Sequence, residues 1–80
     1  MQIGKGVIVY PLTAIDPDVT LCNFVFLNKG TSIGHDASIG EYTVLSPHCT
    51  VGGHTIIENR CFIGMGACIL QNIRAVQEGL

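Results

Sequence analysis

Residues 27–53 read LNKGTSIGHDASIGEYTVLSPHCTVGG, and every sixth residue of this stretch, starting from its first, is Leu, Ile or Val. The period extends in both directions without insertion, so that all twelve hexapeptides between residues 3 and 74 begin with an aliphatic residue. An amphipathic helix would space its apolar residues by three and four, and a flat strand would space them by two. A period of six therefore indicates short strands joined by regular corners.

The fifth residue of each hexapeptide has its own pattern. It is Val, Thr, Ala or Cys in eleven of the twelve repeats, and Ile73 is the exception. Glycine occupies the second position in five repeats. We expect the first and fifth residues to point inward, and Gly, Asn, Asp and Pro near the corners to supply the turn geometry.

Three such edges close one triangular coil, so that residues three hexapeptides apart in the sequence stack on one another. The chain is then an all-β, parallel β-helix of about four triangular coils, with a rise of about 4.8 Å per coil from the spacing of strands. Residues 1–80 form a single hexapeptide-repeat domain. The predicted interior columns are Ile3, Leu21, Ile39 and Ile57; Val9, Leu27, Leu45 and Ile63; and Ile15, Ile33, Val51 and Ile69. A solenoid needs capped ends, and no capping helix follows the last repeat, so we expect a fragment or truncated form of a longer protein, or an end that a partner covers.

The composition narrows the possible partners. The chain is 48% hydrophobic and 12% charged, which is too apolar for a disordered segment and favours a subunit contact. A net charge of −2 with four scattered basic residues argues against binding to nucleic acid. No apolar run approaches the roughly 18 residues of a membrane span, and no secretion signal is evident. The four cysteines contain no CxxC pair, so we expect reduced thiols in a cytoplasmic protein.

The repeat resembles that of the hexapeptide acyltransferase superfamily over essentially the whole chain. The resemblance implies a left-handed coil, which is an exception to the usual right-handed crossover. It also implies a homotrimer that binds acetyl-CoA between neighbouring subunits. Residues 27–53 further resemble sugar acetyltransferases of the sialic-acid O-acetyltransferase and bacillosamine N-acetyltransferase type. Those enzymes carry an Asn, a His-Asp or His-Glu pair seven residues later, and then a Gly-Gly, which correspond to Asn28, His35-Asp36 and Gly52-Gly53.

The resemblance implies acetyl transfer from acetyl-CoA to a sugar or nucleotide-sugar acceptor. A base must take the proton from the acceptor hydroxyl or amine, and histidine suits this role because its pKa lies near neutrality. We therefore predict His35 as the general base and Asp36 as the carboxylate that tunes it. The relatives often carry a second histidine near the acetyl group where this chain has Val44. The residues predicted to bind acetyl-CoA are Asn28, Val44, Gly53, Gly64, Met65 and Gly66.

Other interpretations of the histidines stay open. His54 follows Asp36 by three hexapeptides, so a pair at about 5 Å is expected, either sharing the carboxylate or forming a surface ladder. His48 lies on a different corner and could face His35 across a trimer interface. The γ-class carbonic anhydrases share the fold and use two histidines five residues apart, but His48 plus five is Gly53, so no metal is expected. A non-catalytic trimerising module is a further alternative.

Overall fold

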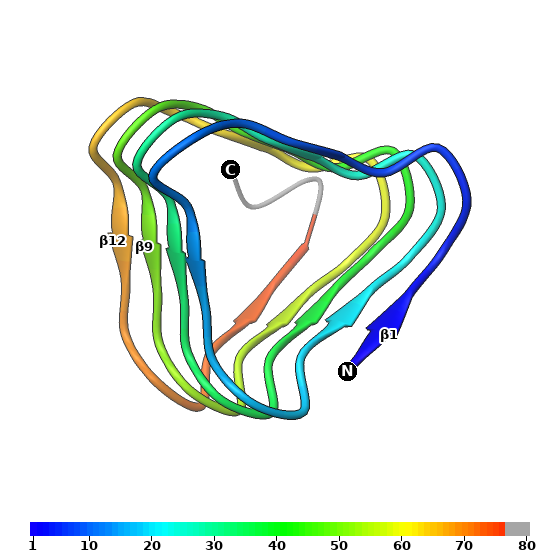
Figure 1. The fold of residues 1–80 in the computed structure, drawn as a ribbon. Coiled ribbons are helices and arrows are strands. Elements are labelled where there is room, and N and C mark those ends of the chain that lie inside the picture. The colour runs from blue at the N-terminus through cyan, green and yellow to red at the C-terminus, as the bar shows by residue number, and fades with distance from the viewer. Residues whose placement is uncertain (77–80) are drawn as a thin grey trace.

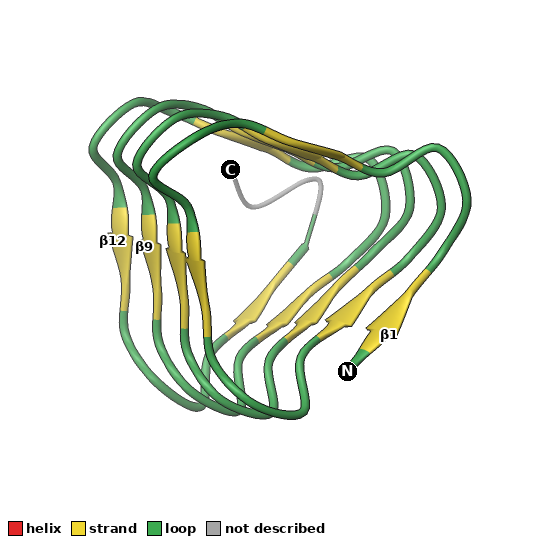
Figure 2. Cartoon of the chain, viewed as in Figure 1, coloured by secondary structure: helices red, strands yellow, loops and turns green. Residues whose placement is uncertain are grey.

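The computed structural model describes residues 1–76, which form a three-sided coil of two-residue parallel strands (Figures 1 and 2). The first sheet contains β1 (Gln2–Ile3), β4 (Thr20–Leu21), β7 (Ser38–Ile39), β10 (Ile56–Ile57) and β13 (Arg74–Ala75). The second contains β2 (Ile8–Val9), β5 (Phe26–Leu27), β8 (Val44–Leu45) and β11 (Phe62–Ile63). The third contains β3 (Ala14–Ile15), β6 (Ser32–Ile33), β9 (Thr50–Val51) and β12 (Cys68–Ile69). These residues include no helix that could cross a bilayer.

The register confirms the predicted stacking. Every strand pair is parallel and joins residues three hexapeptides apart, for example Leu21 with Ile39 in the first sheet and Leu27 with Leu45 in the second. The three predicted columns all stack as expected, and the first column gains a fifth member, Ala75, because β13 begins another turn. Two members are not interior: Ile3 and Val9 are 56% and 44% exposed, because no coil covers them on the N-terminal side. The all-β fold and the four full coils are therefore as the hexapeptide period predicted.

The coil is left-handed. Seen along its axis in Figure 1, the chain runs counterclockwise as it recedes from its N-terminal coil, and a path that recedes in this sense is a left-handed screw. This agrees with the handedness that the family resemblance implied, and it departs from the right-handed rule for crossovers between parallel strands.

The corners are tight turns whose second central residue has a left-handed backbone. The fourth residue of every hexapeptide has a φ between 59° and 74°, which is close to the value required at this place in a type II turn. Only three of these twelve residues are glycine; the others include Leu12, Phe24 and Tyr42. The expectation that Gly, Asn, Asp and Pro would supply the turn geometry was therefore too narrow. The left-handed conformation disfavours side chains with a Cβ by about 1–2 kcal/mol each, and burial of the flanking inward residues offsets that cost.

The glycines in the second position have a different purpose, which Gly34 illustrates. A Cβ added to Gly34 would lie 2.5 Å from the backbone nitrogen of Gly53 in the next coil. The absence of a side chain lets two coils approach at strand spacing, and a positive φ is not involved. Gly64 has the same place in its repeat, but a Cβ added there would meet nothing within 4 Å.

The core is a column of aliphatic side chains lined by small residues at the corners. Leu21, Leu27 and Leu45 are fully or almost fully buried, as the aliphatic first position predicted. The fifth position holds buried threonines whose hydroxyls donate to corner carbonyls, for example Thr43 Oγ1 to Glu58 O at 2.9 Å and Thr55 Oγ1 to Leu70 O at 2.8 Å. Buried polar groups therefore have partners, which explains why Thr can alternate with Val, Ala and Cys at this position.

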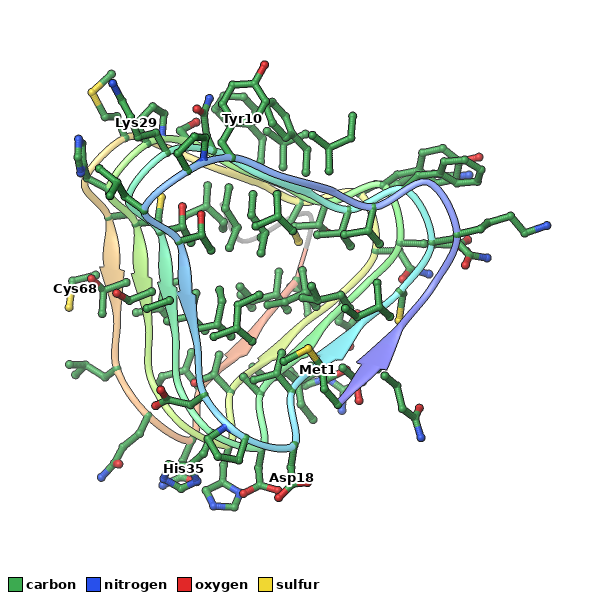
Figure 3. The ribbon with its side chains drawn as sticks, viewed as in Figure 1. Met1, Tyr10, Asp18, Lys29, His35 and Cys68 are labelled. Carbon is green, nitrogen blue, oxygen red and sulfur yellow. The ribbon has the colours of Figure 1, made fainter. Side chains whose placement is uncertain are left out.

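Three corners join the three sheets. The histidine corner contains residues 17–18, 35–36, 53–54 and 71–72, and the methionine corner contains residues 11–12, 29–30, 47–48 and 65–66. The aromatic corner contains residues 5–6, 23–24, 41–42 and 59–60. The third sheet lies between the methionine and histidine corners, the first between the histidine and aromatic corners, and the second between the aromatic and methionine corners (Figure 3).

Candidate functional site

His35 and Asp36 form a side-chain pair on the histidine corner. They are the two central residues of the turn between β6 and β7, and His35 Nδ1 lies 3.1 Å from Asp36 Oδ2. Both side chains are about half exposed. The backbone N–H of Asp36 donates to the carbonyl of Pro17 in the coil below at 3.1 Å, which fixes the corner. In the tautomer that carries its proton on Nδ1, His35 donates to the Asp36 carboxylate, and the lone pair of Nε2 takes no part in this contact.

Gly53 provides the space in which the imidazole of His35 lies. A Cβ added to Gly53 would be 3.0 Å from Nε2 and 3.3 Å from Cδ2 of His35. Those distances are tighter than ordinary contacts, so the ring occupies the place that a side chain at residue 53 would need. From the sequence, Gly53 was predicted to bind acetyl-CoA. In the structure it adjoins the base, and its contact with the ring is a role that the sequence did not indicate.

His54 completes a cluster with this pair. Its Nε2 lies 3.9 Å from Asp36 Oδ2, and its ring is perpendicular to that of His35, with the centroids 4.9 Å apart. The backbone N–H of His54 donates to the carbonyl of His35 at 2.9 Å. The stacking of His54 on Asp36 was predicted from their separation of three hexapeptides. Asp36 consequently faces two imidazoles rather than serving His35 alone.

The other residues predicted to bind acetyl-CoA gather elsewhere. Val44 lies in β8 and Asn28 directly follows β5, so both belong to the second sheet. The amide oxygen of Asn28 accepts a hydrogen bond from the backbone N–H of Lys29 at 2.7 Å. Gly64 directly follows β11, and Met65 and Gly66 form the adjoining methionine corner, where Met65 is 73% exposed. A Cβ added to Gly66, like one added to Gly64, would meet nothing within 4 Å.

One chain therefore does not bring the predicted base and the predicted acetyl-CoA residues together, apart from Gly53. The whole third sheet separates the histidine corner from the methionine corner, as the positions of His35 and Lys29 in Figure 3 show. An edge of six residues is roughly 20 Å long at the rise of a β-strand. A site that contained both groups would need residues from two copies of the chain.

His48 lies on the methionine corner, and its ring occupies the space beside Gly30. It is therefore on a different corner from His35 and His54. Among the described residues of one chain, the three histidines do not form a common metal-binding cluster. The group that does come together is His35, Asp36 and His54, whose potential ligand atoms all lie within 4.8 Å of one another.

Residues 18–53 match the protein family described as bacterial transferase hexapeptide (six repeats). This match agrees with the hexapeptide period that runs through the sequence and with the coils of the structure. It is also 32% identical over 72 residues to GDP-perosamine N-acetyltransferase of Escherichia coli O157:H7, over 90% of this chain and 33% of that protein. The chain thus spans about a third of the length of this curated relative. No solved structure gives a significant match to the chain.

This hexapeptide-repeat chain also has a shallow groove on its first sheet that the sequence analysis did not predict. The groove has a volume of about 660 Å³ and is lined by Cys22, Ser38, Gly40, Ile56, Ile57, Glu58, Asn59, Arg74 and Val76. The side chains of Glu58 and Arg74 form an ion pair at its rim. The sequence does contain a pattern that could have predicted the groove, because the small residues Ser38 and Gly40 stack beneath the longer Ile56 and Glu58. Small residues beside long ones leave a hollow.

Proposed function

We propose that this chain is the β-helix of an acetyl-CoA-dependent acetyltransferase that acts on a sugar or nucleotide-sugar acceptor. The observation that carries the proposal is the exposed His35–Asp36 pair, in which the carboxylate contacts Nδ1 rather than Nε2. The family match to bacterial hexapeptide transferases and the likeness to GDP-perosamine N-acetyltransferase support it. The same base could serve an acceptor amine or an acceptor hydroxyl, so the proposal includes both N- and O-acetylation.

In this proposal His35 is the general base. Nε2 takes a proton from the acceptor amine or hydroxyl as that atom attacks the thioester carbonyl of acetyl-CoA. The carbon–sulfur bond then breaks, and the proton held on His35 passes to the departing thiolate, so that the products are the acetylated sugar and CoA. Asp36 stabilises the imidazolium that forms between the two steps. A positioned base of this kind contributes roughly 10²–10⁴-fold to a rate, and no nucleophilic side chain is required.

The position of the acetyl-CoA residues leads us to propose a homotrimer. His35 lies on the histidine corner of one copy, whereas Met65 and Gly66 lie on its methionine corner, one sheet away, with Gly64 beside them. Threefold packing brings a corner of one subunit against a different surface of its neighbour. The second sheet carries exposed Ile8, Tyr10 and Phe62, and contact with another copy would cover this apolar surface.

Gly64 and Gly66 support a role in holding the pantetheine arm of acetyl-CoA. Neither has an atom within 4 Å of the place where a Cβ would lie, so their backbone groups are open to a ligand. Asn28 and Val44 share the outer surface of the second sheet with Gly64, which makes one continuous strip along which an extended chain could lie. In this arrangement Val44 would contact the cofactor through van der Waals packing, since its side chain cannot hydrogen-bond.

The test is acetyl transfer from acetyl-CoA to a panel of amino sugars and nucleotide-linked amino sugars, with the acetylated product measured by mass spectrometry. His35→Gln should reduce the rate by roughly 10²–10⁴-fold while the sedimentation of the trimer is unchanged. Lys5→Gln is the matched control, because Lys5 is an exposed residue at the same place in its repeat but on the aromatic corner. A rate unchanged in His35→Gln would remove His35 from the mechanism. A stable trimer without any transfer would favour the non-catalytic module instead.

A further inference from the structure

We propose that His35, Asp36 and His54 form a binding site for a divalent transition-metal ion of the Zn²⁺ type, and that the bound ion inhibits the transferase. The binding part stands on the geometry of the three side chains alone. The inhibitory part rests on the proposed function, because it requires His35 to be the base. The ion is not a cofactor here, so the proposal leaves the expectation of metal-independent catalysis in place.

The distances between the ligand atoms suit a small tetrahedral ion. His35 Nδ1 and Asp36 Oδ2 are 3.1 Å apart, and Asp36 Oδ2 and His54 Nε2 are 3.9 Å apart. One ligand atom from each of the three residues lies within 4.8 Å of the others. Zinc–nitrogen and zinc–oxygen bonds of about 2.0–2.2 Å put neighbouring tetrahedral ligands about 3.3 Å apart. Small rotations of exposed side chains would therefore close the three atoms around one ion.

The backbone holds the three residues in place while their side chains remain free to rotate. Asp36 and His54 occupy the same turn position in successive coils, with φ values of 60° and 59°. The hydrogen bond from the His54 N–H to the His35 carbonyl fixes the separation of the coils at this corner. All three side chains are about half exposed, so an ion can enter and a water molecule can take the fourth position.

The surroundings favour a cation, and the ligand types favour a transition metal. Asp18 lies one coil below Asp36 on the same corner (Figure 3), which adds a second carboxylate. The histidine corner contains no Lys or Arg in any of its four coils. Two imidazoles with one carboxylate suit Zn²⁺, Cu²⁺ or Ni²⁺, whereas Mg²⁺ and Ca²⁺ prefer oxygen ligands alone.

Coordination would remove the base whichever nitrogen of His35 is used. If the ion binds Nε2, the lone pair that should accept the proton is occupied. If it binds Nδ1, the imidazole proton moves to Nε2, and that nitrogen becomes a donor. In both cases Asp36 is also withdrawn from its role in stabilising the imidazolium.

The binding is tested by calorimetric titration of the metal-free full chain with ZnCl₂. We expect one ion per chain, and an affinity at least tenfold lower for His54→Gln. His48→Gln is the matched control, because His48 is also an exposed histidine with a left-handed backbone, but on the methionine corner. Cys68→Ser controls for the exposed thiol. Both controls should bind as the wild type does; no binding to the wild type, or equal binding to His54→Gln, would overturn the site.

The inhibition is tested by the acetyl-transfer assay with added ZnCl₂. Zn²⁺ should slow the wild type, a chelator should restore the rate, and at least tenfold more Zn²⁺ should be needed to inhibit His54→Gln. Stoichiometric binding without slower transfer would refute the inhibitory part and keep the site. If no transfer occurs with any acceptor, the proposed function fails and inhibition with it, whereas the calorimetric result still decides whether the site exists.

Discussion

Asp36 lies between two imidazole rings, with its Oδ2 3.1 Å from Nδ1 of His35 and 3.9 Å from Nε2 of His54. The two contacts arise in different ways. His35 is the chain neighbour of Asp36, whereas His54 reaches it because the coil returns to the same corner after three hexapeptides. One carboxylate therefore has a part in both the proposed proton transfer and the proposed metal site.

Replacing this carboxylate should weaken both activities. Asp36→Asn retains a short side chain that tolerates the left-handed backbone, so the corner should keep its shape. We expect a loss of acetyl transfer smaller than the roughly 10²–10⁴-fold loss for removal of the base, together with weaker Zn²⁺ binding. Steady-state kinetics and calorimetry on the same preparation measure the two effects. A variant with unchanged kcat/KM would show that Asp36 does not tune His35.

Filling the space between Gly53 and the ring of His35 should slow acetyl transfer without unfolding the coil. In Gly53→Ala the new Cβ would lie 3.0 Å from His35 Nε2, so the exposed ring must move away. A displacement of about 1 Å can cost on the order of 100-fold in rate, and we expect a loss between about tenfold and 100-fold. The new Cβ would also lie 3.2 Å from the backbone oxygen of His35, so the corner must shift slightly, and we expect a small fall in the thermal midpoint of unfolding. A normal rate would mean that the ring position seen here does not matter for catalysis.

Two glycines at the same place in the repeat should respond differently to alanine. Gly34→Ala would put a Cβ 2.5 Å from backbone of the next coil, whereas Gly64→Ala would meet nothing within 4 Å. Overpacking of a tight site costs typically about 1–3 kcal/mol, and an exposed substitution about 0.5 kcal/mol or less. Urea unfolding of both variants measures the difference. Equal free energies of unfolding would contradict the explanation of the second-position glycines.

Burial of the aliphatic columns should contribute most of the free energy of unfolding of the coil. Leu45 is fully buried in the middle of the second sheet, so Leu45→Ala should lower the free energy of unfolding by about 2–5 kcal/mol. Leu70 is 70% exposed, and Leu70→Ala should stay within about 0.5 kcal/mol of the wild type. Chemical denaturation of the two leucine variants gives the comparison. A larger loss for Leu70 would point to a contact between copies of the chain at that position.

The cysteines should separate into reactive and protected thiols. Burial raises the pKa of the Cys49 thiol, and burial together with the charge of Glu58 raises the pKa of the Cys61 thiol. A thiol with a raised pKa in the folded state loses its stabilising contribution as the pH rises from the ordinary value, near about 8.5, through the folded value. We expect rapid alkylation of the exposed Cys68, slow alkylation of Cys49 and Cys61, and falling stability above about pH 8.5. Mass spectrometry of partly alkylated protein and unfolding curves against pH measure these outcomes.

Most of the fold could be predicted from the sequence because each residue type repeats with one period. Leu27 and Leu45 could be assigned to one column simply by counting three hexapeptides along the chain, and the register confirms it. The turn chemistry could not be predicted in the same way. Phe24 and Tyr42 have left-handed backbones that their residue types disfavour, and their rings stack with centroids 5.1 Å apart. The regular path of the coil imposes that conformation on whichever residue stands at the position.

The candidate site was predictable only in part. The separation of three hexapeptides predicted that His54 would stack on Asp36, but the side-chain rotamers that bring three ligand atoms within 4.8 Å are not encoded in the period. The same counting of hexapeptides places Gly66 on a different corner from His35, with Gly64 beside it. That separation could have been deduced from the sequence, and it is the reason for proposing a site between two copies. The contact of Gly53 with His35 depends on the orientation of the ring, which the repeat does not specify.

Because every corner is the same kind of turn, such a chain can gain or lose whole hexapeptides during evolution and still form a coil. Inserting or deleting one hexapeptide between Asp36 and His54 would keep every aliphatic residue inside, yet it would carry His54 a third of a revolution around the axis. A change of three hexapeptides would restore its direction at a different height. In this architecture the corner on which a residue lies therefore decides which side chains it can contact. A change of length that leaves the interior intact is enough to separate one cluster of side chains and to bring another together.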